Sequence, residues 1–476
     1  MNSRKILSLI LSGIILSASF TGCSENTADT ESSTPSSSES ETTAETEDPN
    51  YIHDSLEKAN FDGYKFRILS DHSGGMYITA EEVNGEAVND ELYASNMTVS
   101  DRFNVSITVL EDMGGYEETV KNTAMAEDNA FDIAIGHDFT TFGLGVQGYL
   151  YNIYDVPQYD FDMPWWTDDA LKNLTIQGKL FGVSNYMSYA GLNQTRAMFI
   201  NKEIAEEHNI VIPYDVVREG NWTYDTMGTY LSDIAKDLDG DGKMTENDRY
   251  AFSSGYEAWY CMQEAVGVSA YHHDKDGNLY VEVDQEHMVK FVEKLQAIST
   301  KTDWYYGDTS MGQDIFHKGK SLFCYCDIGY ARETFVNGET IYGFLPTPKL
   351  DDLQNDYLNC CTDKPWAISV SVDDERINII GTITEAMSCY NYNKVIPAYF
   401  EGAMKARMAD SPDDSEMLQI IRDTRTIGFA YAYKMEIANI FNNLKDSNRV
   451  ASYVAKYQKV AERKLNDLID AIEELP

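Results

Sequence analysis

The chain has 476 residues, with 78 Asp or Glu against 37 Lys or Arg, and therefore a formal net charge of -41 at pH 7. A surface this acidic excludes nucleic acids and anionic lipids as electrostatic partners. About 425 residues follow the first fifty, which is more than one hydrophobic core normally holds and suits two lobes. Aromatic residues make up 12% of the chain, and such rings either fill cores or line a pocket for a neutral ligand.

Residues 1–22 are predicted to be an export signal, because Arg4 and Lys5 precede an apolar run that is too short to span a bilayer. The run ends in Phe-Thr-Gly-Cys, which resembles the bacterial lipobox, although Phe20 stands where Leu is usual. This resemblance implies that Cys23 is lipidated and becomes the first residue of the mature protein. An ordinary cleaved signal, with Cys23 incidental, is the alternative.

Residues 23–50 are rich in Ser, Thr, Asp and Glu and contain no Lys or Arg. Such a composition cannot bury enough apolar surface to offset its ordering entropy, so we expect a disordered tether. No later stretch of the sequence is long and apolar enough to cross a bilayer. The predicted location is the outer face of the bacterial cytoplasmic membrane, held there through the lipid only.

Three short apolar runs, each followed by polar residues, alternate with helical patterns after the tether. The runs are 64–69, 105–110 and 131–135. Asn89 is expected to cap the helix before the second run. This alternation predicts a parallel sheet, whose strand ends gather ligand-binding loops. We therefore predict ligand contacts from Asp71 and His72 after the first run and from His137 and Asp138 after the third. A solvated His and a loop-capping Asp are the alternative for the last two.

Two glycine-rich matches do not predict a nucleotide site. Residues 143–148 fit GxGxxG, but seven residues separate them from the preceding strand, whereas the dinucleotide motif requires the first glycine directly after it. Residues 319–321, Gly-Lys-Ser, lack the upstream glycine of a phosphate loop, because that position is Asp314. The pair Trp165 and Trp166 is left open between core and site.

Residues 237–248, DLDGDGKMTEND, have the spacing of a calcium loop, with Gly242 at the sixth position, where the loop turns sharply. The predicted oxygen ligands are those of Asp237, Asp239, Asp241, Lys243 through its carbonyl, Thr245 and Asp248. The twelfth position is Asp instead of Glu, a shorter arm. We expect a structural Ca²⁺, since clustered carboxylates repel one another without a cation. A signalling pair would need a second loop, which the sequence lacks.

The strand predicted at 250–252 is followed by Tyr256, Glu257 and Trp259. A flat ring stacks on the apolar face of a pyranose while a carboxylate accepts from its hydroxyls, so these three residues are candidate ligand contacts. Core packing is the alternative. The later aromatic run at 304–306 is open between core and cleft rim.

The run 321–326 alternates little, which predicts a strand buried on both faces, and it leads to Asp327 and Tyr330 at its end. Both are candidate ligand contacts, because a ligand crevice lies at such strand ends. Pro346 and Pro348 follow and suit a stiff connection between lobes. The six later cysteines are predicted to be buried thiols, with disulfides as the alternative. They lack metal-binding CxxC spacing. They are Cys261, Cys324, Cys326, Cys360, Cys361 and Cys389.

Several motifs recur in order along the chain. They are FDIAIGHD…GYLYNI, PWW…GKLFGV…FINK, FHKGKSLF…YGFLPTPK, DDLQNDY and IPAYFEGAMKARMADSPDDSEMLQII. Together they resemble the extracellular solute-binding proteins of ABC importers, of the large oligosaccharide-binding kind, over nearly all of the chain after residue 60. The resemblance implies an α/β, two-lobe, periplasmic-binding-protein-like fold of type II (maltose-binding-like) with a hinge and an interlobe cleft. The expected first lobe is 55–185 plus 345–395, and the second is 186–344 plus 396–476.

The implied function is that of the substrate-binding component of an ABC transporter. It captures a small carbohydrate, an oligosaccharide or related solute, in the cleft and delivers it to the permease subunits. The protein is expected to act as a monomer. The alternative is an extracellular glycan-active enzyme, a glycoside hydrolase or lyase with a structural calcium, which would need paired carboxylates at the scissile bond. No GxSxG or HExxH motif occurs, and the strand-helix alternation with a proline hinge favours binding without catalysis.

Overall fold

The computed structural model describes residues 48–112, 114–256, 258–275, 277–301, 304–338, 340–435 and 447–475. The pattern of contacts between residues divides the chain into two units, with the boundary after Asn50. Every helix and strand described below belongs to the unit that begins at Tyr51. None of the helices in the described ranges has a window apolar and long enough to span a membrane. The predicted lipid site, Cys23, lies outside the described residues.

The first sheet has the strand order β12-β3-β1-β2. Its strands are β1 (Tyr64–Ser70), β2 (Val105–Glu111), β3 (Ile133–Ile135) and β12 (Trp366–Ala367). β1 pairs in parallel with β2 and β3, while β12 pairs antiparallel with β3. The predicted strand-helix alternation and parallel core are therefore confirmed, and the loops after β1 and β3 leave the same edge of the sheet.

The helices beside this sheet are α1 (Ala87–Phe103), α2 (Tyr116–Ala126), α3 (Asp138–Val146), α4 (Asp168–Leu174) and α13 (Asp374–Asn393). We call them and the first sheet the first lobe. α1 begins after Glu86, whose side chain accepts from the amide of Asn89, so the expectation that Asn89 caps this helix is wrong. A carboxylate at the helix start also suits the positive end of the dipole.

Trp165 and Trp166 belong to the core of the first lobe. Their side chains are buried, and their indole nitrogens donate to Oε1 and Oε2 of Glu385 on α13 at 3.0 and 3.1 Å. Burial raises the pKa of Glu385 to about 8. The question that the sequence left open for this pair is thus decided in favour of packing.

The second sheet has the order β10-β4-β9-β5-β8. Its strands are β4 (Arg196–Asn201), β5 (Tyr250–Gly255), β8 (Trp304–Gly307), β9 (Ser321–Asp327) and β10 (Tyr342–Leu345). All described residues of β4 and β5, and all of β9 except Asp327, are buried, as expected of a strand covered on both faces.

The helices beside the second sheet are α6 (Lys202–Glu207), α7 (Tyr214–Arg218), α8 (Tyr224–Tyr230), α9 (Ala258–Ala265), α10 (Gln285–Lys301), α11 (Thr309–His317) and α12 (Tyr330–Glu333). These and the second sheet are called the second lobe, together with the hairpin of β6 (Tyr271–His273) and β7 (Leu279–Val281). The later elements are α14 (Val395–Pro397), the π-helix η4 (Ala398–Met408), α15 (Pro412–Asp423), α16 (Phe429–Ala432) and α18 (Val450–Glu473).

Three segments carry the chain between the sheets. α5 (Ala190–Asn193) leads into β4, β11 (Asn359–Cys361) precedes β12, and β13 (Arg425–Ile427) follows α15. β11 pairs in parallel with β13. The backbone of Cys361 also forms an isolated antiparallel β-bridge with that of Thr195. The proline segment lies along Trp222, whose indole nitrogen donates to the carbonyl of Pro346 at 2.9 Å. All six described cysteines are free and buried, in agreement with the predicted thiols.

Candidate functional site

A small cavity of about 130 Å³ lies where the ends of both sheets meet the crossing segments. The first lobe contributes His137, which follows β3. The second lobe contributes Arg196, at the start of β4, and Asp327, at the end of β9. The full lining is His137, Gln194, Arg196, Tyr260, Cys261, Asp327, Thr362 and Tyr431. The cavity is therefore enclosed by residues that are far apart in the chain.

One wall carries a charged pair. Arg196 and Asp327 face each other in the antiparallel register of β4 and β9, and Nε of the arginine lies 3.2 Å from Oδ1 of the aspartate. The arginine side chain is 5% exposed and the aspartate side chain 18%. A guanidinium offers fixed donors and a carboxylate offers acceptors, so the pair suits a ligand with neighbouring hydroxyl groups.

Another part of the lining is aromatic. The rings of Tyr260 and Tyr431 stack with centroids 4.6 Å apart and an interplanar angle of 26°. His137 lies 6.1 Å from Tyr431 and 4.0 Å from Phe139, both measured between ring centroids. Apolar ring faces beside a charged hydrogen-bonding pair form a surface for a solute with one polar and one apolar face.

Buried carboxyl groups support both walls. Nδ1 of His137 lies 2.6 Å from Oδ1 of Asp138, which is 1% exposed. The other oxygen of Asp138 accepts a hydrogen bond from the amide of Asp363 at 3.4 Å. The carboxylate of Asp363 in turn accepts one from the hydroxyl of Ser184. Burial raises the pKa of Asp363 to about 6. These contacts hold the histidine ring against the segment that crosses between the sheets.

Glu264 lies one turn of α9 after Tyr260, against Gly428, where an added Cβ would come 3.0 Å from the carboxyl carbon. Burial raises the pKa of Glu264 to about 8 and that of Tyr260 well above its ordinary value. Oε1 of Glu264 has no hydrogen-bond partner within the described part of the chain. A neutral carboxylic acid therefore stands behind the aromatic wall at neutral pH.

No family model matches the chain, and no curated protein sequence matches it at a significant level. Solved structures do match. A cyclo/maltodextrin-binding protein complexed with maltotetraose aligns with a TM-score of 0.54 and 15% identity, over 86% of this chain and 96% of that one. The chain has the solute-binding-protein fold. This confirms the predicted two-lobe, maltose-binding-like architecture.

Two further structures with the solute-binding-protein fold agree. An ABC substrate-binding protein from Listeria monocytogenes, in complex with cycloalternan, aligns with a TM-score of 0.51 and 11% identity, covering 87% of this chain and 99% of that one. A solute-binding protein from Agrobacterium radiobacter K84, in complex with ribitol, aligns at 0.50 and 12%, covering 85% and 100%. At these identities the likeness concerns the fold alone.

The solute-binding-protein fold brings two of the predicted ligand residues, His137 and Asp327, into the same cavity. Asp138 lies directly behind His137 and does not line the cavity. Tyr330 is the first residue of α12 and follows Asp327 by three residues, and burial, together with that carboxylate, raises the pKa of Tyr330 to about 12. These four residues are thus gathered at the junction of the lobes.

The remaining predicted contacts lie elsewhere. Asp71 pairs with Lys364 of the crossing segment at 2.7 Å, and although burial opposes the shift, this ammonium holds the pKa of Asp71 below its usual range. His72 is exposed. Tyr256 is 55% exposed, with its ring 5.2 Å from Tyr306, and does not line the cavity. Glu257 and the side chain of Trp259 lie outside the described residues.

Sequence reasoning missed most of the cavity wall. Tyr260 lies in the aromatic group that was singled out but was not itself chosen. Arg196 carried a signal that could have been used, a charged residue directly before the apolar run 197–200. The others, Gln194, Cys261, Thr362 and Tyr431, have no distinguishing local pattern.

The predicted calcium loop brings three carboxylates together. Asp237, Asp239 and Asp248 each offer an oxygen, and these atoms lie within 4.8 Å of one another. Backbone donors, led by the amides of Leu238 and Thr245, hold the pKa of Asp248 below its usual range. Oδ1 of Asp241 instead accepts from the Lys243 amide at 2.8 Å. Three of the predicted ligands therefore fit a hard cation.

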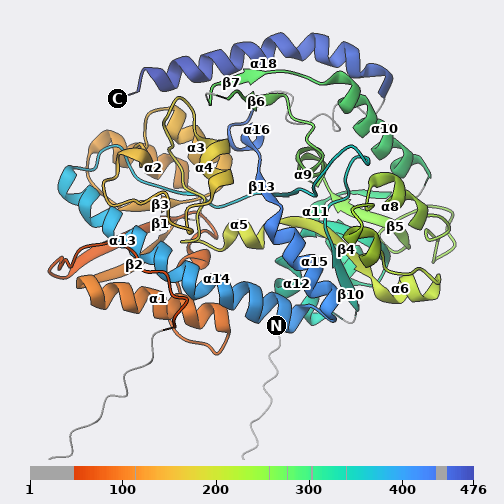
Figure 1. Ribbon diagram of the computed structural model, residues 1–476, viewed down its shortest axis with the longest axis horizontal. Coiled ribbons are helices and arrows are strands. Elements are labelled where there is room, and N and C mark those ends of the chain that lie inside the picture. The colour runs from red at the N-terminus through yellow and green to blue at the C-terminus, as the bar shows by residue number, and fades with distance from the viewer. Residues whose placement is uncertain are drawn as a thin grey trace, which may run out of the picture. The chain divides into compact units, whose positions relative to one another are not determined.

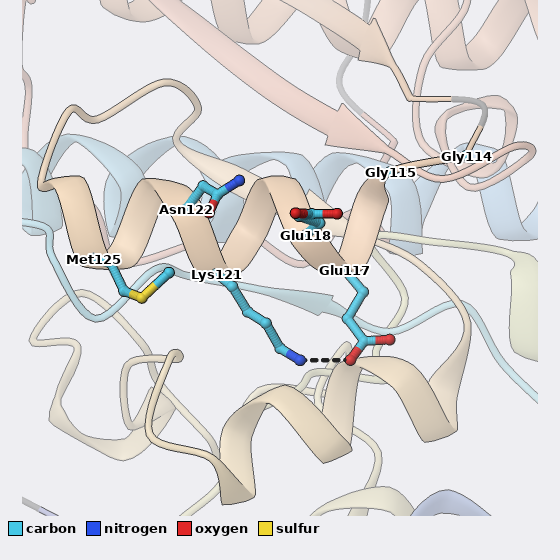
Figure 2. Close-up of a pocket in the computed structure, with 7 residues that line it drawn as sticks. All are labelled: Gly114, Gly115, Glu117, Glu118, Lys121, Asn122 and Met125. Carbon is cyan, nitrogen blue, oxygen red and sulfur yellow. Dashed lines mark hydrogen bonds and ion pairs between the residues drawn. The ribbon is translucent and has the colours of Figure 1, made fainter.

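A second hollow, of about 500 Å³, lies on the outer face of α2 (Figure 2). Its residues come from one helix and the loop before it, and Lys121 pairs with Glu117 one turn away at 2.7 Å. Exposed pairs of this kind contribute little to stability. The hollow lacks the buried charges and crossing segments that distinguish the cavity between the sheets.

Proposed function

We propose that the protein is the solute-binding component of an ABC importer and holds a carbohydrate in the cavity lined by Arg196, Asp327, Tyr260 and Tyr431. The observation that carries the proposal is this cavity, lined by a largely buried guanidinium-carboxylate pair and by stacked rings, at the junction of the sheets of a solute-binding-protein fold. Three proteins with this fold were solved with maltotetraose, cycloalternan and ribitol, all polyhydroxylated molecules.

The enzyme alternative has less support. A glycosidase needs two carboxyl groups that flank the scissile bond. Among the described residues that line the cavity, the one carboxylate is Asp327, and Arg196 pairs with it. A single carboxylate that is paired with a guanidinium can accept hydrogen bonds from a solute, and it lacks the second carboxyl group that hydrolysis of the solute would need.

Anchoring and delivery complete the proposal. We infer that residues 1–22 direct export, that Cys23 carries a lipid and that residues 24–50 tether the monomer to the outer face of the cytoplasmic membrane. The solute-loaded lobes then dock on the permease subunits. The strong negative charge argues against direct binding to an anionic membrane surface and leaves the lipid as the attachment.

We expect Asp327→Asn to weaken carbohydrate binding by about tenfold to a hundredfold, because a charged hydrogen-bond acceptor is lost from a pair that is largely shielded from water. Titration calorimetry with maltotetraose, cycloalternan and ribitol as probes would first identify a bound solute and then compare variants. Asp352→Asn, at an exposed position, is the matched control.

If none of the three probes produced heat of binding, that result would contradict the carbohydrate assignment. An Asp327→Asn protein that bound as tightly as the control would mean that the solute lies elsewhere. New reducing ends after incubation of maltotetraose with the protein would favour the enzyme alternative.

We also propose that the loop of Asp237, Asp239 and Asp248 holds a structural Ca²⁺. At tenfold saturation, the ion should stabilise the fold by about 1–2 kcal/mol, seen as a rise in melting temperature. Asp239→Asn should abolish this rise, whereas Asp467→Asn, exposed on α18, should keep it. A wild-type melting temperature that is the same in chelator and in Ca²⁺ would contradict the proposal.

A further inference from the structure

The short segment Gly428–Tyr433 touches both lobes. On the second lobe, Tyr431 stacks on Tyr260 of α9, and the ring of Phe429 lies 5.7 Å from that of Tyr271 in β6. Gly428 lies so close to the Tyr260 hydroxyl that an added Cβ would overlap it. No larger residue fits at this position without moving the aromatic wall of the cavity.

On the first lobe, the same segment packs against α3 and α4. The ring of Tyr433 lies 5.0 Å from that of Phe142, and its hydroxyl donates to the carbonyl of Leu174 at 2.7 Å. The ring of Tyr431 lies 6.0 Å from that of Phe139. The segment is therefore wedged between the lobes, with Tyr431 as the part that reaches the cavity.

Helix α18 makes a second connection. It contacts α10 and β7 of the second lobe and α3 of the first (Figure 1). At its carboxyl end, Nζ of Lys179 donates to the carbonyls of Ile472, at 3.2 Å, and Leu475. A cation beside the last carbonyls of a helix satisfies acceptors that the helix leaves open and complements its dipole.

The apolar face of α18 joins the cores of both lobes. Its buried side chains are Val450, Val454, Ala461, Leu465, Leu468 and Ile472. They belong to one continuous hydrophobic cluster with Phe291 and Leu295 of α10 and with Leu144 of α3. Separating the lobes along this helix would expose apolar surface as well as break the hydrogen bonds of Lys179.

We propose that Gly428–Tyr433 and α18 together form a strap that holds the lobes closed over the cavity, and that release of the strap from the first lobe admits the solute. The cavity, at about 130 Å³, is smaller than the roughly 300 Å³ at which pockets for drug-sized ligands begin. An oligosaccharide therefore requires part of the cavity wall to move, and Tyr431 is the part of the wall that the strap carries. Since Tyr431 and α18 both contact the first lobe through α3 or its start, release of one loosens the other.

Two substitutions weaken the attachment to the first lobe. Lys179→Met removes the donors to the end of α18 but keeps an apolar stem. Leu475→Asp places a carboxylate in a hollow that Leu475 shares with Leu150, Phe181 and Asp155. Lys459→Met, exposed in the middle of α18, is the control for the loss of one positive charge.

The readouts are hydrogen exchange and small-angle X-ray scattering on the full-length protein without added solute. Both variants are expected to show about tenfold faster amide exchange in α18, in α16, in the first turn of α3 and in the cavity-lining part of α9, together with a larger radius of gyration. The control should match the wild type. Strands β1 and β9 should stay protected in all of them, which separates lobe opening from global unfolding.

Faster exchange confined to the end of α18, with unchanged scattering, would overturn the proposal, because the helix would then fray without holding the lobes. Loss of protection in β1 and β9 of the Lys179→Met protein would overturn it as well, since the contact would then support the fold as a whole. Neither readout involves a solute. The strap proposal can therefore be contradicted while the proposed carbohydrate binding is supported, and carbohydrate binding can be contradicted while the strap is supported.

Discussion

Replacing Glu264 with Gln is expected to stabilise the protein at about pH 8 by roughly 2–5 kcal/mol and to leave its stability near pH 4.5 almost unchanged. Burial raises the pKa of Glu264 from an ordinary 4.5 to about 8. Between these two values the folded protein holds a proton that the unfolded chain releases. The contribution of Glu264 to stability is therefore fully present below pH 4.5, falls as pH rises through the window, and is lost above about pH 8.

Urea unfolding midpoints across this pH window would measure the effect, with the exposed Glu293→Gln on α10 as the control. A residual slope should persist in Glu264→Gln, because burial also raises the pKa of Glu385 to about 8 and that of Asp363 to about 6, both with the same sign. If the Glu264→Gln protein lost stability with pH as steeply as the control, Glu264 would have to be charged and solvated in the folded state.

The elements that the sequence predicted correctly are those whose pattern is local. β1, β2 and β9 were found within one residue of their ends, because an apolar run bounded by polar residues is visible in a short window. The start of α1 was misplaced because its cap is the long side chain of Glu86, whereas Ser, Thr, Asp and Asn are the usual caps. A local rule therefore fails where an unusual residue performs the usual task.

The candidate site divides in the same way. His137 and Asp327 could be predicted because each directly follows a strand, and strand ends mark the ligand edge of the sheet. Tyr431 could not, because it reaches the cavity only through the wedge between the lobes, about 170 residues from its stacking partner Tyr260. Such a pairing is set by tertiary packing, and no periodicity or spacing within the segment records it.

Breaking the buried ion pair of the first lobe should cost more than breaking any exposed pair. Asp132 is fully buried and its Oδ1 accepts from Arg376 at 2.5 Å and from the Tyr64 hydroxyl at 2.6 Å. The same guanidinium nitrogen donates to the carbonyl of Phe131 at 2.8 Å, which ties α13 to β1 and the start of β3. Arg376→Met leaves the buried carboxylate with only the partly exposed guanidinium of Arg67, 3.4 Å from Oδ2, as counter-charge. We therefore expect a loss of about 3 kcal/mol in the free energy of unfolding.

The matched control is Arg218→Met. Arg218 pairs with Asp215, Asp413 and Glu416, but its side chain is 33% exposed and water screens the pairs, so the expected loss is much smaller than that of Arg376→Met. Asp132→Asn completes a double-mutant cycle with Arg376→Met, and the double variant should lose clearly less than the sum of the single losses. Urea unfolding of the four proteins measures the coupling. Additive losses would show that Asp132 and Arg376 stabilise the first lobe through separate contacts, with the ion pair contributing nothing of its own.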